Sequence, residues 1–275
     1  MALDMNWLKK ALEITGDFET SGNPWAGITG DFDRMGISCG VLQWNIGTGS
    51  LQPMIIAVGK PFVVQKMPQF GEKLWTACNS SIAQGLTIVR SWQTNATLKP
   101  TPRTELQNLF GSDKMINQQM QKSKKLGQNA MTLATKWAKD SRGATAPRLQ
   151  EFCWFFDLLT QSGGLSGIWV ADVKNFIAAN SPANADNVIC DWLDNYPPKV
   201  TVGGEQLNVA GRADGKKNAA LWRNKIKPES LELFVLTYIR AQKSKAQYRP
   251  VVMNRRGTIA ATKGYVNAEL ENFTF

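Results

Sequence analysis

The sequence predicts a mainly α-helical protein with one small β element near its N-terminus. Two observations predict this fold class. Over most of the 275 residues, apolar side chains recur at the spacing of one helix face, starting with residues 4–19. Between residues 27 and 44, by contrast, four glycines accompany a short apolar stretch, Ile37–Trp44, which is typical of a hairpin or a glycine-rich strand pair.

The predicted helices follow in order along the chain. The first ends at the segment from Ser21 to Pro24, which places Glu19 at or just past its last turn. A loop at residues 47–50 then precedes a helix that opens at Leu51–Ile56. Further helices are predicted at residues 70–77, 82–92, 104–110, 114–139, 149–161, 170–179, 185–193 and 229–242.

Glycine and proline mark the segments between these helices. Gly127 is a place where the long helix at 114–139 can break, and Gly163 with Gly164 ends the helix at 149–161. Residues 196–215 are rich in glycine and proline, and predict loops with a short hairpin. The chain after Pro250 is too weakly patterned to assign.

The length allows one large domain or two lobes. Because the chain has no internal repeat and no low-complexity linker, we expect a single domain over residues 1–275. In it, residues 1–60 hold the first helix and the hairpin, and residues 61–275 form a mostly helical body. No apolar run approaches the roughly 18 residues that span a bilayer, so no membrane insertion is expected.

The chain contains no histidine, which is the most decisive feature of its composition. This excludes Ser-His-Asp and Cys-His hydrolases, His-based nucleases and most catalytic zinc sites. The four cysteines form no CxxC pair, and we expect them to be buried as small apolar residues. In an oxidising compartment, a disulfide between two of them is the alternative. Carboxylates are the remaining acid–base groups, and neither a metal nor an organic cofactor is expected.

The net charge of +10 favours polyanionic partners: nucleic acid, an anionic membrane or an acidic cell wall. Residues 114–148 contribute one acidic residue, Asp140, and eight basic ones, Lys114, Lys122, Lys124, Lys125, Lys136, Lys139, Arg142 and Arg148. This segment is either a face that binds an anionic wall polymer or a solvated helix surface. No nucleic-acid-binding module is recognisable, so no specific nucleic acid partner is expected.

One segment combines the groups that glycoside hydrolysis requires. It runs from Phe18-Glu19-Thr20-Ser21-Gly22 into a glycine-rich stretch that carries Asp31 and Asp33. Glycosidases use one protonated carboxylic acid to donate to the leaving oxygen, and a second, ionised one to activate water or stabilise positive charge. Glu19, beside apolar Phe18, suits the first role through desolvation. Asp33 suits the second role, and the alternative for Asp33 is turn formation. Asp31 is the substitute for Asp33 as base, and otherwise a candidate for substrate binding.

These residues resemble the lysozyme-like superfamily, in which a catalytic glutamate at a helix end faces a small β-hairpin. Glu-Thr-Ser-Gly followed by Gly-Val-Leu-Gln looks like the soluble lytic transglycosylases and goose-type lysozymes. The spacing of Asp33, Gly36 and Gly40 is more similar to family 46 chitosanases and their cell-wall relatives. The resemblance implies a lysozyme-like fold whose hairpin forms one wall of the active-site cleft, with Glu19 as acid and Asp33 as base of an inverting reaction.

Further residues are candidates for substrate binding, each with a structural alternative. Ser38 either positions a water molecule or faces its own backbone, and Gln43 binds an N-acetyl group, as the resemblance favours, or satisfies buried backbone. Trp25 and Trp44 stack on sugar rings or belong to the core. The resemblance extends to Asp157, Gln161 and Gly163. Since Asp157 and Gln161 share a helix face, they either line the cleft or tie two helices together.

The charge decides between the substrates that the resemblance allows. Chitosan is polycationic and a chain of +10 repels it, whereas peptidoglycan is anionic. We therefore expect a peptidoglycan glycan-strand hydrolase, a muramidase rather than a glucosaminidase. A lytic transglycosylase or a chitosanase is the alternative within the same class. A non-catalytic basic module that binds cell wall or nucleic acid is the alternative from another class.

The N-terminus shows no basic start followed by an apolar core, so no Sec signal peptide is expected. A wall hydrolase then needs another route out of the cytoplasm in which it is made, or the chain is a domain of a longer protein. Phage lysis enzymes and antibacterial effectors of secretion systems both use such routes, and we favour the effector. It would act in the periplasm or cell wall of a target bacterium, and an immunity protein would be its partner.

Overall fold

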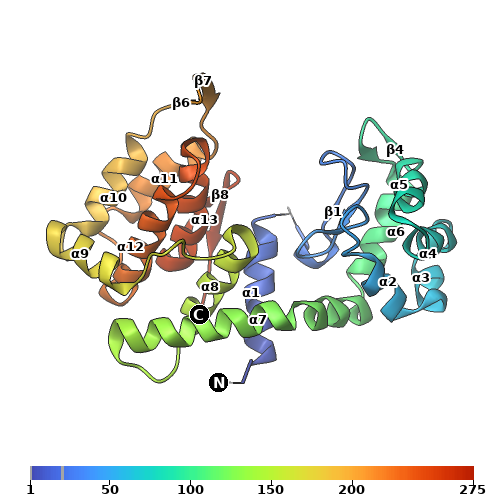
Figure 1. Cartoon of the computed structure of the whole chain (residues 1–275), viewed down its shortest axis with the longest axis horizontal. Helices are drawn as coiled ribbons and strands as arrows, with labels where there is room; N and C mark the ends of the chain where they lie inside the picture. The colour runs from blue at the N-terminus through green and yellow to red at the C-terminus, as the bar shows by residue number, and fades with distance from the viewer. Residues whose placement is uncertain (1, 20–21) are drawn as a thin grey trace. The chain divides into compact units, whose positions relative to one another are not determined.

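The computed structural model describes residues 2–19 and 22–275. Figure 1 shows helices α1 to α13 in these residues, with four small antiparallel sheets between them. The prediction of a mainly α protein with minor β structure is therefore confirmed. The lysozyme-like fold that the resemblance implies stays a prediction.

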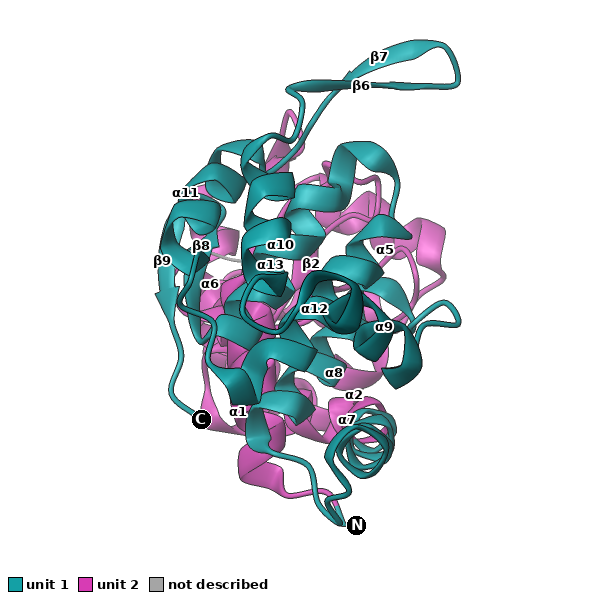
Figure 2. Ribbon diagram, turned by 90° about the vertical axis from the view of Figure 1, so that its left-hand side faces the viewer, with its two compact units in different colours: residues 1–2, 128–275 teal, residues 3–127 magenta. Residues whose placement is uncertain are grey.

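The chain divides into two compact units (Figure 2). The N-terminal unit comprises Leu3–Gly127, and the C-terminal unit comprises Gln128–Phe275 together with Ala2. The division falls inside α7 (Asp113–Arg142), which is one continuous helix of 30 residues. It does not fall near residue 60, where we divided the expected single domain.

The break that we predicted near Gly127 is absent, because this glycine serves close packing within the N-terminal unit. A Cβ atom added at Gly127 would lie 2.9 Å from Leu8 Cδ1 and 3.0 Å from Leu3 Cδ2. The missing side chain lets α1 (Met5–Asp17) approach α7 at this point. Helix α1 begins at Asp4, whose Oδ1 accepts a hydrogen bond of 2.7 Å from the Asn6 N–H.

The other helices of the N-terminal unit are η1 (Pro24–Ala26), α2 (Gln52–Val58), α3 (Lys60–Lys66), α4 (Gly71–Cys78), α5 (Ile82–Arg90) and α6 (Pro100–Phe110). Its strands are β1 (Ile28–Thr29), β2 (Ser38–Cys39), β3 (Trp44–Asn45), β4 (Gln93–Thr94) and β5 (Thr97–Leu98). Strands β1, β2 and β3 form an antiparallel sheet in that order, with Cys39 opposite both Ile28 and Trp44. The predicted hairpin is thus a three-stranded sheet of very short strands.

A buried carboxylate joins two helices of this unit. Glu105 on α6 is 7% exposed, and its two oxygens accept hydrogen bonds of 3.0 Å from the backbone N–H groups of Gln69 and Phe70. Phe70 is the residue that precedes α4, so the negative charge lies at the positive end of that helix. This contact holds α6, which carries part of the candidate site, against α4.

The C-terminal unit contains helices α8 (Leu149–Ser162), α9 (Val170–Asn180), α10 (Ala185–Asp194), α11 (Arg212–Trp222), α12 (Pro228–Gln242) and α13 (Arg249–Ala261), with η2 (Ala246–Tyr248). Two hairpins accompany them, β6 (Lys199–Val202) with β7 (Glu205–Asn208), and β8 (Lys263–Val266) with β9 (Glu269–Asn272). Five elements were absent from our assignment in this unit: α11, η2, α13, β8 and β9. The sequence analysis missed helix α13 because the helix is buried on almost all sides. Polar side chains are among its buried residues, so the sequence shows no single apolar face.

Candidate active site

Glu19 lies two residues beyond the end of α1, as the sequence predicted. Its backbone N–H donates to the Gly16 carbonyl oxygen at 2.9 Å, which closes the last turn. The side chain is exposed, whereas the neighbouring Phe18 is buried. The desolvation that we expected at this carboxyl group is therefore not present. Thr20 and Ser21, which belong to the same motif, lie outside the described residues.

Glu19 lines a cavity of about 300 Å³ within the N-terminal unit. The other lining residues come from the segment around η1, from β1 and from α6: Asn23, Ala26, Gly27, Ile28, Thr29, Arg103 and Gln107. The cavity is thus polar, with one carboxylate, one guanidinium, two amides and one hydroxyl. The cavity thus brings the residue beyond the end of α1 together with strand β1 and helix α6.

Gln43 supports the wall of this cavity from behind. Its Oε1 accepts a hydrogen bond of 3.0 Å from Thr29 Oγ1, and its Nε2 donates to the carbonyl oxygens of Gly40 at 2.9 Å and Gly27 at 3.4 Å. Gln43 has a left-handed φ of 53°, which a non-glycine residue adopts only when its surroundings require it. The structure favours the second of the two roles left open for Gln43, satisfaction of backbone, and it fixes two residues that line the cavity.

Arg103 and Gln107 are site residues that the sequence analysis missed. They lie one turn apart on α6, on its exposed face, and Arg103 Nη2 donates to the Ile28 carbonyl oxygen at 3.3 Å. The sequence does contain a signal for this pair, because Arg103 and Gln107 are polar and four residues apart, which places them on one helix face. We began the helix at residue 104, however, which left Arg103 outside it, and nothing in the sequence connects this segment to Glu19.

Asp33 lies at the exposed tip of the loop between β1 and β2, and it is absent from the residues that line the cavity. One of its oxygens, Oδ1, accepts a hydrogen bond of 3.0 Å from the Met35 N–H. This is the turn-forming role that we gave as the alternative for Asp33. The structure does not bring Asp33 into the cavity with Glu19, and its role as base stays a prediction.

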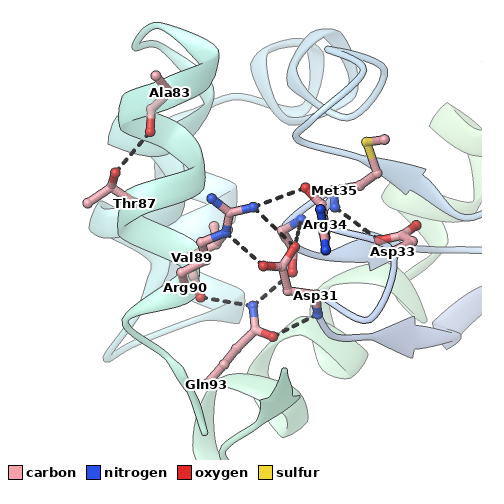
Figure 3. A network of polar contacts seen from close by, with 10 residues as sticks. Asp31, Asp33, Arg34, Met35, Ala83, Thr87, Val89, Arg90 and Gln93 are labelled. Atoms are coloured by element: carbon pink, nitrogen blue, oxygen red, sulfur yellow. Dashed lines mark hydrogen bonds and ion pairs between the residues drawn. The ribbon is translucent and has the colours of Figure 1, made fainter. Parts of the chain in front are cut away.

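Asp31 is engaged in a network that anchors the same loop (Figure 3). Arg90 Nε donates to Asp31 Oδ2 at 2.7 Å, and the Gly36 N–H donates to Oδ1 at 2.6 Å. Burial alone would raise the pKa of Asp31, but the hydrogen bonds from Arg90 and Gly36 and the charges of Arg90 and Arg34 leave it below its ordinary value. Asp31 is thus an ionised anchor of the loop.

Three more candidates are buried in the N-terminal unit. Trp25 is 5% exposed, Trp44 is 8% exposed and Ser38 is 3% exposed. A tryptophan that stacks on a sugar needs one open ring face, so these exposures favour the core alternative for both rings. Ser38 lies within β2, opposite Thr29 and Asn45.

Asp157 and Gln161 lie on α8 in the C-terminal unit. Asp157 has no exposed surface and forms ion pairs with Arg255 Nε at 2.6 Å and Arg256 Nε at 3.2 Å, both on α13. Such a carboxylate holds two helices together and does not meet a ligand from solvent, so of the two roles left open for Asp157 the structure favours the helix-tying one over the substrate contact. Gln161 is exposed, and its assignment stays a prediction.

Several basic side chains of the segment 114–148 have partners within the protein. Lys136 pairs with Asp140, Arg142 pairs with Glu151, and Lys114 Nζ donates to the Val58 carbonyl oxygen at 2.8 Å. Because several of these charges already have partners, the structure favours the solvated helix surface over a continuous face for a wall polymer.

All four cysteines, Cys39, Cys78, Cys153 and Cys190, are buried. Burial raises the pKa of the Cys39 thiol well above its ordinary value and that of Cys78 to about 12, so both are inert as nucleophiles. Among residues 2–19 and 22–275, no cluster of carboxylates and thiols is arranged to hold a metal ion. Within the same residues, no helix combines the length and apolar character that crossing a membrane requires.

Comparison with known proteins adds no family to this picture. The chain significantly matches no protein-family model, no curated protein and no solved structure. The resemblance to lysozyme-like enzymes therefore stays a prediction from the sequence motif around Glu19.

Proposed function

We propose that this protein cleaves the glycan strands of peptidoglycan, with Glu19 as the general acid. The observation that carries the proposal is the cavity in which Glu19, at the end of α1, shares a polar wall with Arg103 and with strand β1. A helix-terminal glutamate beside a small antiparallel sheet is the arrangement that the motif implies. The polar lining supplies donors and acceptors for a sugar.

Glu19 would protonate the glycosidic oxygen while the bond from that oxygen to the anomeric carbon breaks. The exposure of Glu19 lets its proton be replaced from solvent after each turnover. In the inverting reaction, Asp33 takes a proton from the water that attacks the anomeric carbon. The Met35 N–H donates to Asp33 Oδ1, so we assign the proton transfer to the second carboxylate oxygen, Oδ2.

Arg103 favours peptidoglycan over chitosan. A guanidinium in the cavity attracts the carboxylates of peptidoglycan stem peptides and repels the ammonium groups of chitosan. The net charge of +10 acts in the same direction over longer distances. The amides of Asn23 and Gln107 are of the type that hydrogen-bonds an N-acetyl group.

One observation favours lytic transglycosylation as the second candidate. Among the residues that line the cavity, Glu19 is the one carboxylate. A transglycosylase needs one carboxyl group, which first protonates the leaving oxygen and then accepts the proton of the sugar's own hydroxyl as that oxygen bonds to the anomeric carbon. Water is not consumed, and the product is an anhydro-sugar.

Digestion of purified peptidoglycan, with mass spectrometry of the products, tests both candidates. Glu19→Gln should lower the rate by a factor of about 10² or more. Glu13→Gln, on the same helix and paired at 3.8 Å with Lys9, is the matched control and should leave the rate unchanged. Reducing-end muropeptides that are lost in Asp33→Asn would support hydrolysis, and anhydro-muropeptides that persist in Asp33→Asn would support transglycosylation.

The outcome that contradicts the proposal is an unaltered rate in Glu19→Gln, or no products from folded wild type. A non-catalytic basic module would instead show salt-dependent binding to sacculi that Glu19→Gln leaves unchanged. Action in the wall of a target bacterium and an immunity protein as partner belong to this proposal too. Protection of a peptidoglycan substrate by a co-produced partner would test the last.

A further inference from the structure

The loop between β1 and β2, which we call the tip loop (Asp31–Gly36), presents an unusual side chain. Phe32 is 74% exposed, more than any other large apolar side chain in the described residues, of which Tyr248 follows at 50%. Within residues 28–50, which are all described, Phe32 is the one large apolar side chain that is classed as exposed. The adjacent Asp33 and Arg34 are exposed too.

This exposure does not come from a loosely held loop. Arg90 bridges the two arms of the loop, since its Nε donates to Asp31 Oδ2 at 2.7 Å and its Nη2 to the Arg34 carbonyl oxygen at 3.0 Å. Gln93 bridges them a second time, since its Oε1 accepts from the Asp31 N–H and its Nε2 donates to the Gly36 carbonyl oxygen, both at 2.8 Å. Figure 3 shows both side chains directed into the loop from the end of α5 and the start of β4.

The backbone of the loop is fixed at both ends by close packing. A Cβ atom at Gly30 would lie 2.0 Å from the Ala96 carbonyl oxygen, and one at Gly36 would lie 2.8 Å from Leu86 Cδ2. Gly36 has a φ of +87° and Arg34 a φ of +66°, so the turn occupies a conformation that its neighbours must enforce. Phe32 is consequently held out in solvent by a loop that is already ordered.

An ordered, exposed aromatic ring among hydrogen-bonding side chains suits a sugar. The ring offers an apolar face to the C–H groups of a pyranose, while charged neighbours bind its hydroxyl and carboxyl groups. Because the loop is held in advance, binding loses little conformational entropy. An apolar protein partner would instead require a contiguous apolar patch, which residues 28–50 do not expose.

We propose that Phe32 is a glycan-stacking contact and that Arg90 and Gln93 are positioning residues which hold the tip loop to present it. The inference rests on the proposed function for its ligand, the peptidoglycan glycan strand. It adds a binding residue to the machinery without requiring that Asp33 be the base.

Binding to purified sacculi, measured in the Glu19→Gln background so that no strand is cut, tests the proposal. Phe32→Leu should weaken binding about tenfold, because leucine keeps the apolar character and removes the ring. Phe32→Trp keeps an aromatic ring and should bind sacculi about as tightly as the Glu19→Gln parent. Tyr248→Ala, the most exposed aromatic alternative, is the matched control and should bind as the parent does.

The positioning role has its own readout. Arg90→Ala should accelerate amide hydrogen exchange at Gly36 and weaken binding of sacculi, and the double variant with Phe32→Leu should bind no more weakly than Phe32→Leu alone. Arg90→Lys keeps the charge but loses the paired donors, so it should restore binding only in part. A purely structural role for Arg90 would give additive losses, which would overturn the assignment.

The outcomes separate this inference from the proposed function. If wild type cuts peptidoglycan while Phe32→Leu binds as tightly as its parent, the stacking contact is wrong and the function stands. If wild type cuts nothing while binding still depends on the ring, the catalytic proposal is wrong and the stacking contact stands. The proposed stacking contact is wrong if Phe32→Leu binds sacculi as tightly as its Glu19→Gln parent. It is also wrong if Phe32→Trp loses as much binding as Phe32→Leu.

Discussion

Two aspartate–arginine clusters, one in each unit, use the same chemistry in opposite surroundings. In the C-terminal unit, Asp157 pairs with Arg255 and Arg256, and the three side chains are between 0% and 4% exposed. In the N-terminal unit, Asp31 pairs with Arg90, and these side chains are 17% and 44% exposed. The difference in burial decides what each cluster contributes.

In the buried cluster, three charges have lost their water, and each depends on the others. Burial lowers the pKa of Arg256 to about 10, even though Asp157 raises it. Arg256 Nη2 also donates to Ser162 Oγ at 2.6 Å, which leads back to the end of α8. In the exposed cluster, water screens the attraction between Asp31 and Arg90, so the pair adds little to the free energy of unfolding. Its hydrogen bonds instead fix the conformation of the loop. The buried cluster thus holds two helices together, and the exposed cluster shapes one loop.

The largest effect is expected from Asp157→Ala. Removing this carboxylate leaves Arg255 and Arg256 without their shared counter-ion in the interior, which should lower the free energy of unfolding by about 3–5 kcal/mol. Urea unfolding, followed by far-UV circular dichroism, measures it. Asp191→Ala is the control in the same unit, since Asp191 is 62% exposed and pairs with Arg223, and it should cost less than about 1 kcal/mol. Equal losses in the two variants would contradict the comparison.

The contrast also explains which features were predictable from sequence. The helix that ends before Glu19 has one apolar face and a clear stop signal, so both its extent and the position of Glu19 followed from local pattern. Helix α13 carries Arg255 and Arg256 inside the core. A sequence pattern that assigns buried positions to apolar residues cannot predict such a helix, because two of its buried residues are charged.

The candidate site was predictable in part for a related reason. Glu19 and the small sheet lie within one short stretch of chain, where a motif can connect them. Arg103 enters the cavity from α6, far along the chain, and only tertiary packing brings it there. Gln43 was named, but its three hydrogen bonds behind the cavity wall depend on the register of β1 and β2.

A smaller effect on stability is expected from Arg90→Ala, and this sharpens the comparison. The pair that it removes is partly exposed, so the free energy of unfolding should fall by no more than about 1 kcal/mol. The loop should nevertheless open, because the Gly36 N–H donates to the carboxylate that Arg90 holds. Hydrogen exchange resolved by residue should therefore show a local change at Gly36 with little change in the core of the unit. A loss of 3 kcal/mol or more would place the exposed cluster in the same class as the buried one.

The smallest effect is the pH dependence of the exposed cluster. The pKa of Asp31 is lower in the folded protein than in the unfolded chain, so its pairing contributes stability that is fully present above the unfolded value of about 4. That contribution is lost as the pH falls through the folded pKa, where the carboxylate takes up a proton and releases Arg90. The difference in unfolding free energy between wild type and Asp31→Asn should therefore be constant near neutral pH and shrink on acidification below about pH 4. A difference that grew on acidification would mean that the protonated carboxyl is the form the loop holds. In that case, an ion pair between Asp31 and Arg90, weakened by solvent screening, would be the wrong description of the exposed cluster.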